Sequence, residues 1–296
     1  MTWTNLVIQI SADSVEKTTD YLVNLGALSV SIQDKNLNQN NEEIIFGEPH
    51  NGPHQYWQEN SISVLFEENI DVNIIKNKLE NFLNKKIEVI VSRVENQDWV
   101  KTSQDQFHPI CIRDKFWIIP TWHKHELKKG INLILDPGLA FGTGSHPTTH
   151  LCIEWLMDHV KKNNRVLDYG CGSGILAIAA KKIGCQSALG VDIDPQALIA
   201  SKDNALLNNV TIQISASSEP IEINADLIVA NILSSALSVL APALAGYCKP
   251  KGMIALSGIL EAQESQIKEI YEEWFDIINV TRKEGWVCIS GLRLNN

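Results

Sequence analysis

The sequence predicts an α/β protein in which a small ferredoxin-like α+β domain precedes a doubly wound, Rossmann-like domain with a parallel sheet. Three observations support this prediction. In the first third of the chain, the apolar pattern indicates the element order βαββαβ. From residue 107 onward, strands alternate with helical stretches, as in a parallel sheet covered by helices. Within that part, an apolar strand at 165–168 runs directly into a glycine-rich turn and an alanine-rich helix, which is typical of a nucleotide-binding loop.

The size and composition of the chain are those of a globular protein. It has 296 residues, of which 44% are hydrophobic and 20% charged, so two domains can each bury a substantial core. No apolar run approaches the roughly 20 residues of a membrane span, and the first residues lack the features of a signal peptide. We therefore expect a cytoplasmic protein without membrane contact.

The cysteine content and the net charge restrict the classes of partner. The six cysteines are scattered without a C-x-x-C pair, which favours reduced thiols over a zinc site or a redox pair. A net charge of −10 would on average repel a phosphate backbone. A basic protein partner therefore fits better than a nucleic acid, and we expect no direct sequence-specific nucleic acid binding.

The first domain is predicted to occupy residues 1–94. One helix is expected to be capped by Ser11 or Asp13 and to reach Leu25, before the helix-stopping Gly26. Asp71 is expected to cap a second helix that extends to about Leu83. The expected strands span 6–10, 27–33, 61–66 and 87–91, with a further apolar stretch at 44–46.

The second domain is predicted to occupy residues 107–296, after a linker helix at 95–106. Short strands are expected at 110–112, 116–119 and 132–135, and the parallel strands at 165–168, 188–192, 211–215, 226–230 and 253–257. In an open sheet of this kind, ligands bind at the carboxyl ends of the strands. Gly170, Asp192 and Asn231 all fall at such ends.

The glycine spacing distinguishes two classes of cofactor. Gly170, Gly172 and Gly174 form G-x-G-x-G, whereas a dinucleotide fold needs its third glycine one residue later. Asp168 would repel a pyrophosphate but attract an ammonium group. Asp192, 18 residues after Gly174, can bind both hydroxyls of a ribose. The loop therefore predicts an S-adenosylmethionine site, and a nicotinamide-dependent oxidoreductase is the alternative enzyme class.

The segment 135–150 just before this loop is dense in glycine, hydroxyl and turn residues, which predicts a functional loop. Phe141 offers an apolar face. Thr148 and Thr149 can cap a helix that begins near Leu151 and can offer hydroxyl groups to a ligand. The alternative interpretation is a long structural turn.

Asn231 follows the strand 226–230, and its amide can orient an amine without holding the amine's proton. The structural alternative is that Asn231 caps the next helix. DNA and RNA amino-methyltransferases typically have Pro-Pro and an aromatic residue after such a position, where this chain has Ile232, Leu233 and Ser234. Methylation of a nucleic acid base is therefore disfavoured.

The histidines suggest no metal site. His146 and His150 are four residues apart, and His123 and His125 alternate, but neither pair has a matching third ligand nearby. We predict no metal and expect the first pair to form hydrogen bonds in the loop. The tryptophans near the end of the sequence, Trp274 and Trp286, are expected to pack in the core or at an interface.

Four sequence strings together closely resemble the PrmA family, the methyltransferases of ribosomal protein L11: F-G-T-G-S-H-P-T-T, D-Y-G-C-G-S-G-I-L-A-I-A-A, V-D-I-D-P-Q-A and A-N-I-L. The first is the specific one, because many methyltransferases share the glycine loop. The resemblance spans nearly the whole chain and departs from many relatives at Ser145, where they have threonine. It implies a class I methyltransferase domain that transfers methyl groups from S-adenosylmethionine to lysine ε-amines and the N-terminal α-amine of ribosomal protein L11, free or on the large subunit. It also implies that the amino-terminal domain recognises the substrate and that the cofactor contacts Thr149, Gly170, Asp192 and Asn231.

The complete predicted site adds Asp168, Gly172, Gly174 and Ile193 to these cofactor contacts. Asn231, Phe141 and Thr143 are predicted to orient the acceptor amine. A lysine, whose reference pKa is about 10.4, must lose a proton, and a desolvated pocket beside a cationic sulfonium lowers that pKa without a dedicated base. The alternatives are another protein substrate and a non-catalytic module that binds a ribosomal protein. The residues after strand 211–215 lack an acid for the adenine amino group, so the adenine contact is not predicted.

Overall fold

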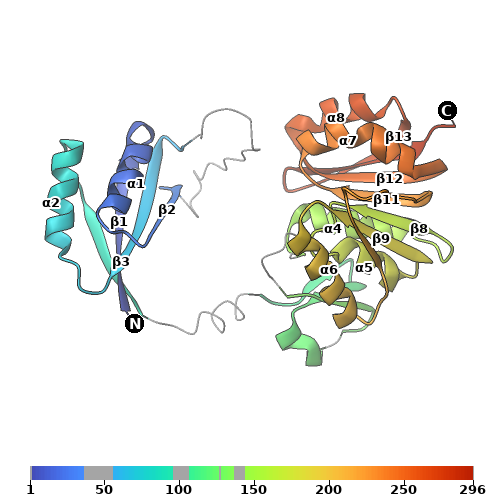
Figure 1. Cartoon of the computed structure of the whole chain (residues 1–296), viewed down its shortest axis with the longest axis horizontal. Coiled ribbons are helices and arrows are strands. Elements are labelled where there is room, and N and C mark those ends of the chain that lie inside the picture. Colours follow the sequence, from blue (N-terminus) through green and yellow to red (C-terminus); the bar gives the residue numbers. More distant parts are fainter. Residues whose placement is uncertain (1, 37–55, 96–106, 127, 137–143, 296) are drawn as a thin grey trace. The chain divides into compact units, whose positions relative to one another are not determined.

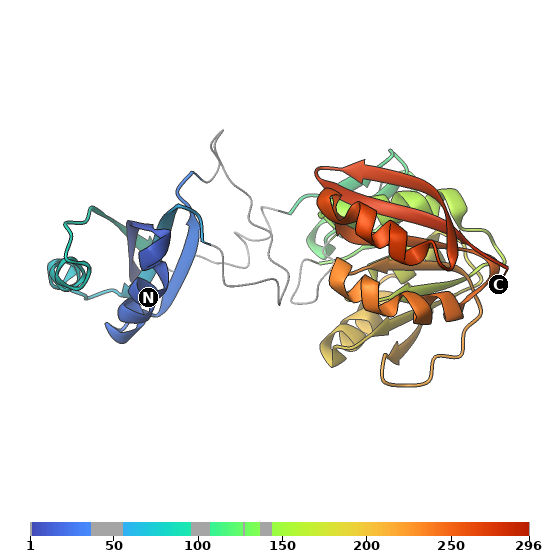
Figure 2. The same cartoon turned by 90° about the horizontal axis from the view of Figure 1, so that it is seen from above.

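The computed structural model describes residues 2–36, 56–95, 107–126, 128–136 and 144–295. The chain divides into two compact units, Met1–Ser103 and Gln104–Asn296, each with its own sheet and core (Figures 1 and 2). The apolar stretch at 44–46 and nearly all of the predicted linker helix at 95–106 lie outside the described residues. No helix in the described ranges is long and apolar enough to cross a membrane.

The first unit has the ferredoxin-like arrangement that the sequence predicts. Its four strands, in the order β2-β3-β1-β4, form a sheet in which β1 is antiparallel to both β3 and β4, and β2 is antiparallel to β3. The two strands of each βαβ half are therefore parallel and are separated by a strand of the other half. The elements are β1 (Thr2–Ser11), η1 (Ala12–Ser14), α1 (Val15–Asn24), β2 (Ser29–Asp34), β3 (Glu59–Glu67), α2 (Val72–Leu83) and β4 (Val89–Glu95).

The two helices of this unit begin differently. The predicted cap of α2 is confirmed, because the carboxylate of Asp71 accepts hydrogen bonds from the backbone N–H groups of Asn73 and Ile74 at 2.9 and 3.3 Å. The predicted cap of α1 by Ser11 or Asp13 is wrong. A 3-10 turn comes first, and α1 then follows Ser14 without a side-chain cap.

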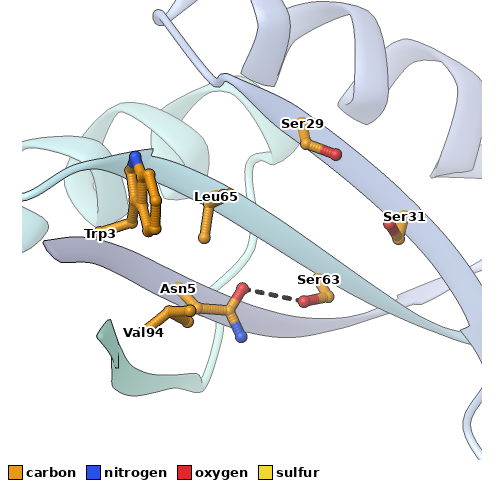
Figure 3. A pocket seen from close by; sticks show the side chains of 7 residues that line it. All are labelled: Trp3, Asn5, Ser29, Ser31, Ser63, Leu65 and Val94. Carbon is orange, nitrogen blue, oxygen red and sulfur yellow. Dashed lines mark hydrogen bonds between the residues drawn. The ribbon is translucent and has the colours of Figure 1, made fainter. Parts of the chain in front are cut away.

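One face of this sheet packs against α1 and α2, and the opposite face carries a groove of about 400 Å³ (Figure 3). Side chains alternate between the faces along each strand. The Ser63 hydroxyl donates a hydrogen bond to Asn5 Oδ1 at 2.8 Å across this face. The sheet groove has no charged side chain in its lining, which consists of Trp3, Asn5, Ser29, Ser31, Ser63, Leu65 and Val94.

The second unit is built on a seven-stranded sheet with the order β10-β9-β8-β11-β12-β14-β13. The five predicted parallel strands are present, and β14 runs antiparallel between β12 and β13. The chain moves outward from β8 to β10 and then returns to β11, so the strand order reverses between β8 and β11. The strands are β8 (Arg165–Tyr169), β9 (Ser187–Asp192), β10 (Gln213–Ala216), β11 (Ala225–Asn231), β12 (Cys248–Leu260), β13 (Phe275–Lys283) and β14 (Trp286–Arg293).

The sequence analysis did not predict the hairpin β13–β14. Its turn is formed by Glu284 and Gly285, which have φ values of 52° and 78°. Two successive residues with positive φ form the tight turn whose twist matches that of an antiparallel hairpin. The Glu-Gly pair between two runs rich in β-branched residues was therefore the available signal.

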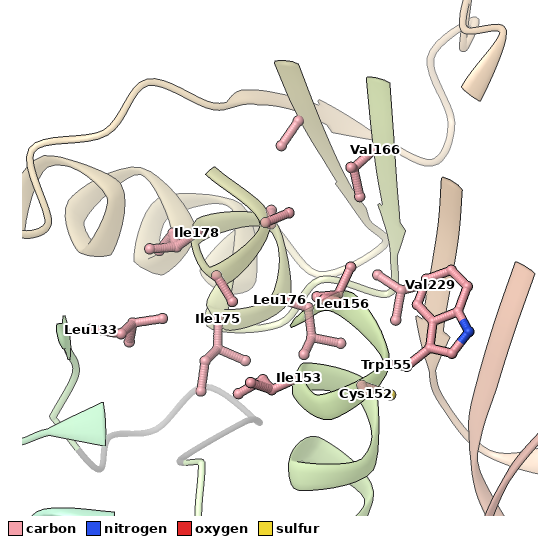
Figure 4. Packing of buried hydrophobic residues seen from close by; sticks show 14 of the residues in the cluster. Leu133, Cys152, Ile153, Trp155, Leu156, Val166, Ile175, Leu176, Ile178 and Val229 are labelled. Carbon is pink, nitrogen blue, oxygen red and sulfur yellow. The ribbon is translucent and has the colours of Figure 1, made fainter. Parts of the chain in front are cut away.

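Helices cover both faces of this sheet (Figures 1 and 2). Val166 and Val229 pack with the helices of one face (Figure 4), whereas their neighbours Leu167 and Ile228 pack with those of the other. This alternation makes the parallel strands apolar on both sides, as expected for a sheet between two helical layers. The first face carries α4 (Pro147–His159), α5 (Ile175–Ile183) and α6 (Pro195–Leu207), and the second carries α7 (Ser234–Tyr247) and α8 (Glu264–Tyr271).

A separate three-stranded sheet of β5 (Ile110–Ile112), β6 (Phe116–Ile119) and β7 (Ile131–Ile134) precedes α4, with η2 (Thr121–Glu126) between β6 and β7. The buried side chain of Asn208 binds both backbone groups of Ile134: Oδ1 accepts from its N–H at 2.8 Å, and Nδ2 donates to its carbonyl at 2.7 Å. Shortly after β7, the Asp136 carboxylate accepts from the N–H and the hydroxyl of Thr121 at 2.6 and 2.8 Å. These contacts fix the point from which the predicted functional loop departs.

Candidate active site

The register of the central strands brings the predicted site residues to one level of the sheet. Tyr169 pairs with Val191 on β9 and with Ala230 on β11. The residues that follow these three are Gly170, Asp192 and Asn231, so they lie side by side at the carboxyl ends of their strands. This is also where the strand order reverses, the position at which open α/β sheets bind ligands.

The glycine turn between β8 and α5 is held closely against β9. The N–H groups of Gly170 and Cys171 both donate to the carbonyl of Val191, at 2.7 and 3.0 Å. Gly170 has a φ of 75°, and a Cβ atom there would lie 2.2 Å from Cγ2 of Ile232. Only glycine fits at this position without moving the strand end.

Asp168 is a carboxyl group buried directly beneath this turn, with 1% of its surface exposed. Its Oδ2 accepts a hydrogen bond from the Ala177 N–H at 2.9 Å, whereas Oδ1 has no partner among the described residues. Burial raises the pKa of Asp168 to about 7; the Ala177 hydrogen bond opposes this effect, and the charge of Asp192 adds to it. A buried carboxyl oxygen without a partner favours a cationic or hydrogen-bond-donating group nearby, which is the chemistry expected for the predicted cofactor contact.

Asp192 supports the glycine turn from the end of β9. Its Oδ2 accepts from the Gly172 N–H at 2.8 Å, and Oδ1 accepts from the Asp194 N–H at 3.0 Å. Each carboxylate oxygen can accept a second hydrogen bond. The half-buried carboxylate can therefore hold the turn and still receive ligand hydroxyls. Its neighbour Ile193 is 84% exposed and offers an apolar surface.

Thr149 lies in the first turn of α4 and is 1% exposed. The helix begins at Pro147, not near Leu151 as predicted, because proline suits the first helical position. The predicted cap by Thr148 and Thr149 is also wrong: the cap is His146, whose Nδ1 accepts from the Thr148 N–H at 3.4 Å.

Asn231 is half-buried at the end of β11. The structural alternative for this residue is wrong, because the N-cap of α7 is Leu233. The following residue, Ile232, donates its N–H to the carbonyl of Ser257 at 3.2 Å. Gly258, with a φ of 84°, would place a Cβ atom 2.2 Å from the Ile232 carbonyl oxygen. The end of β11 is thus packed tightly against β12.

The sequence analysis missed two side chains of α6 that support the glycine turn. Ser201 Oγ donates to the carbonyl of Gly172 at 2.8 Å, and Asn204 Nδ2 donates to the carbonyl of Ser173 at 2.8 Å. Both residues lie on the same helical face as Asn208, at spacings of three and four. The spacing of small polar residues along one face of this helix was the signal that could have identified them.

Other predicted residues have mixed outcomes. Phe141 and Thr143 lie outside the described residues, as does the side chain of His125. The expected hydrogen bonding of His146 and His150 is confirmed, and His150 Nε2 contacts the Gly144 carbonyl at 2.9 Å. All six cysteines are free thiols, and no group of three or more potential metal ligands occurs in the described part of the chain.

Comparisons with known proteins give a consistent result. Residues 2–293 match a family described as ribosomal protein L11 methyltransferase (PrmA). The ribosomal protein L11 methyltransferase of Methylobacillus flagellatus is 48% identical over 294 residues, which cover 99% of this chain and 100% of that protein. Its counterpart in Chromobacterium violaceum is 44% identical over 294 residues, with 99% of each chain covered. A crystal structure of ribosomal protein L11 methylase from Lactobacillus delbrueckii subsp. bulgaricus aligns with a TM-score of 0.59 at 34% identity, covering 64% of this chain and 100% of that one.

The substitution Gly170→Ala is expected to lower the affinity for S-adenosylmethionine by at least about tenfold, because it combines a positive φ with an overlap on Ile232. The double variant Gly170→Ala/Ile232→Ala should recover part of the loss, since only the backbone strain remains. Isothermal titration calorimetry measures both affinities. Gly246→Ala is the matched control, because nothing lies within 4 Å of its added Cβ. An unchanged affinity in Gly170→Ala would contradict the conclusion that only glycine fits beside Ile232 at this strand end.

Binding of S-adenosylmethionine at pH 6 is expected to release close to one proton. Asp168 has a pKa of about 7 and is therefore mostly protonated at that pH, whereas an ammonium ligand favours its ionised form. Consequently, the affinity should fall as the pH is lowered below 7. Titration calorimetry in buffers with different ionisation enthalpies counts the protons. Asp168→Asn should abolish the release, and an equal release in that variant would assign the proton to another group.

Proposed function

This chain belongs to the ribosomal protein L11 methyltransferase (PrmA) family, and we propose on that premise that it transfers methyl groups from S-adenosylmethionine to amines of ribosomal protein L11. The match covers residues 2–293, and the relatives described above are matched over essentially their full length. The observation that carries the proposal is the unpartnered, buried Oδ1 of Asp168 beside the glycine turn. A site for an anionic dinucleotide would not place a buried carboxyl group there.

The residues at the strand ends fit this cofactor in two independent respects. Oδ1 of Asp168 lacks a hydrogen-bond partner that an ammonium group supplies, and the half-buried carboxylate of Asp192 can still accept hydrogen bonds from hydroxyl groups. We assign the ammonium contact to Asp168 and the ribose hydroxyls to Asp192. Ile193 is assigned an apolar contact because of its exposure. The remaining proposed contacts come from Thr149, Asn231 and the backbone at Gly170, Gly172 and Gly174.

When bound, S-adenosylmethionine supplies a methyl group on a sulfonium, which is a good leaving group. The protein's own task is to place a neutral amine in line with that methyl group. The Asn231 amide oxygen accepts a hydrogen bond from the amine but takes no proton from it. Exclusion of water lowers the pKa of a lysine amine and favours its reactive form. Phe141 and Thr143 remain predicted partners in this orientation.

The proposed acceptors are lysine ε-amines and the N-terminal α-amine of L11. An amide oxygen recognises the N–H of any amine, whichever carbon carries it, so Asn231 does not discriminate between these two types. The acceptor is therefore selected by the contacts that the rest of the substrate makes. The net charge of −10 favours a basic polypeptide, and such a substrate places the reaction in the cytoplasm, where ribosomal proteins are made.

We assign substrate recognition to the first unit. The strand ends and the glycine turn that hold the proposed cofactor contacts all belong to the second unit. The first unit instead has an open sheet face with the uncharged sheet groove defined above (Figure 3). Hydroxyls, an amide and the Trp3 ring suit contact with a polypeptide rather than with a phosphate backbone.

Incubation of the protein with radiolabelled S-adenosylmethionine and purified L11 is expected to label L11 on lysine and α-amino nitrogens, as mapped by mass spectrometry. Asn231→Ala should reduce the rate by about 100-fold or more, because the amine loses an orienting hydrogen bond. Label on a different ribosomal protein would overturn the substrate. An absence of label despite cofactor binding would favour a non-catalytic binding module, and a near-normal rate in Asn231→Ala would contradict its role.

The substitution Trp3→Ala is expected to raise the KM for L11 by about tenfold while kcat and the affinity for S-adenosylmethionine stay unchanged, because a large aromatic side chain in a contact surface contributes strongly to binding. Steady-state kinetics with varied L11 measures the effect. Ile74→Ala is the control, since Ile74 is a 52% exposed apolar residue on α2, on the helical side of the same unit. Equal effects of the two substitutions on KM would contradict the assignment of substrate recognition to the sheet groove.

A further inference from the structure

The C-terminal hairpin contacts the start of α4 at two points. Lys283, at the end of β13, places its Nζ 2.9 Å from Nδ1 of His150. The ring of Trp286, at the start of β14, contacts the ring of His146 edge-on, with centroids 4.7 Å apart. His150 Nε2 in turn lies 2.9 Å from the carbonyl oxygen of Gly144. A continuous hydrogen-bonded path, which we call the His150 link, thus joins Lys283 to Gly144.

The chemistry of the link determines the protonation of His150. A lysine ammonium can only donate, so Nδ1 must accept its hydrogen bond. Nε2 then carries the proton and donates to the Gly144 carbonyl. A second proton on the ring would break the Lys283 hydrogen bond and place two cations in contact. The link therefore exists only with the neutral ring in one tautomer.

The surroundings favour this neutral form. Burial lowers the pKa of His150, and the charge of Lys283 lowers it further. The Gly144 hydrogen bond and the carboxylates of Glu154 on α4 and Glu284 in the hairpin turn act in the opposite direction. The effect of Glu154 on the pKa of His150 is weakened, because the Glu154 carboxylate also forms an ion pair with Arg113 at 3.4 Å. His146, one turn earlier, has a pKa that is likewise lowered by burial.

Gly144 occupies a confined position next to the cofactor turn. Its φ is 88°, and a Cβ atom there would lie 2.7 Å from Cδ1 of Ile118 on β6 and 3.2 Å from Cδ1 of Ile175. Ile175 is the first residue of α5 and follows Gly174 directly. The residue before Gly144 in the sequence is Thr143, which is predicted to orient the acceptor amine. The backbone at Gly144 is therefore packed against β6 and the start of α5, and it continues in sequence into the predicted acceptor contact Thr143.

We propose that His150 and Lys283 are positioning residues for methyl transfer: Lys283 holds the neutral ring of His150, and that ring holds the carbonyl of Gly144, which adjoins the predicted acceptor contact Thr143 in sequence. The proposal rests on the function proposed above. Neither side chain needs to touch the reacting atoms. Their removal should therefore slow the transfer step and leave the affinity for S-adenosylmethionine unchanged.

Two substitutions of His150 separate the two halves of the link. His150→Asn keeps an acceptor near Nδ1 for Lys283 but loses the donor to Gly144, whereas His150→Gln keeps a donor near Nε2. We expect kcat for L11 to fall about tenfold in His150→Asn, which loses the contact with Gly144, and about threefold in Lys283→Met and in His150→Gln, each of which loses only the Lys283 hydrogen bond. Lys162→Met, which removes an exposed lysine just after α4, is the control and should match wild type. Thermal unfolding and cofactor affinity are measured on every variant.

The pH profile of kcat provides a readout that a merely structural role would not change. The acceptor amine titrates equally in all variants, so kcat is divided at each pH by the kcat of His150→Gln, which has no ionisable ring. In this ratio, the acid limb of the wild-type protein should lie below the ordinary histidine value of about 6.5. Lys283→Met removes a cation next to the ring, raises the pKa of His150 and should move the acid limb to higher pH. Nitrogen NMR of His150 should show the tautomer protonated at Nε2.

Three results would overturn the positioning role. They are equal rates in His150→Asn, Lys283→Met and wild type, an acid limb that Lys283→Met does not move, or a His150 ring protonated at Nδ1. A wild-type protein that binds the cofactor but leaves L11 unlabelled would overturn the proposed function, and this proposal with it. An active wild-type protein with equally active variants would overturn the His150 link alone.

Discussion

The site is organised around the carboxyl group of Asp168. This group is buried at the point where the strand order of the sheet reverses. A buried carboxylate is unfavourable unless it is paired or protonated, and only one oxygen of Asp168 accepts a hydrogen bond from the described residues. Asp192 adds a like charge and raises the pKa further. The folded protein therefore holds an unfavourable group that a cationic ligand stabilises. Perturbed groups of this kind are characteristic of functional sites.

The surrounding backbone makes this position rigid. The carbonyl of Val191 receives two N–H groups of the glycine turn, and the carboxylate of Asp192 receives a third. Gly170 and Gly258 each approach Ile232 so closely that a side chain would overlap with it. Three neighbouring strand ends are thus locked together by backbone contacts.

Segments far apart in the sequence support this arrangement. Ser201 and Asn204 on α6 and Asn208 just after it bind backbone groups of the glycine turn and of β7. The hairpin β13–β14 reaches the start of α4 through Lys283 and Trp286. The segment that contains Phe141 and Thr143 is therefore flanked in sequence by Asp136 and Gly144, and each of these two residues hydrogen-bonds to a side chain of another element.

The sequence by itself determined the features that depend on local chemistry. Strand alternation and glycine spacing predicted the ferredoxin-like unit, the five parallel strands and the level shared by Gly170, Asp192 and Asn231, because residue periodicity directly reflects the exposure of each face. Other features were decided only by the tertiary structure. The place of β14 inside the sheet, the buried oxygen of Asp168 and the contact of Lys283 with His150 each join groups that are not neighbours in sequence or depend on burial. The energy of such groups is set by surrounding atoms that only the folded chain brings together.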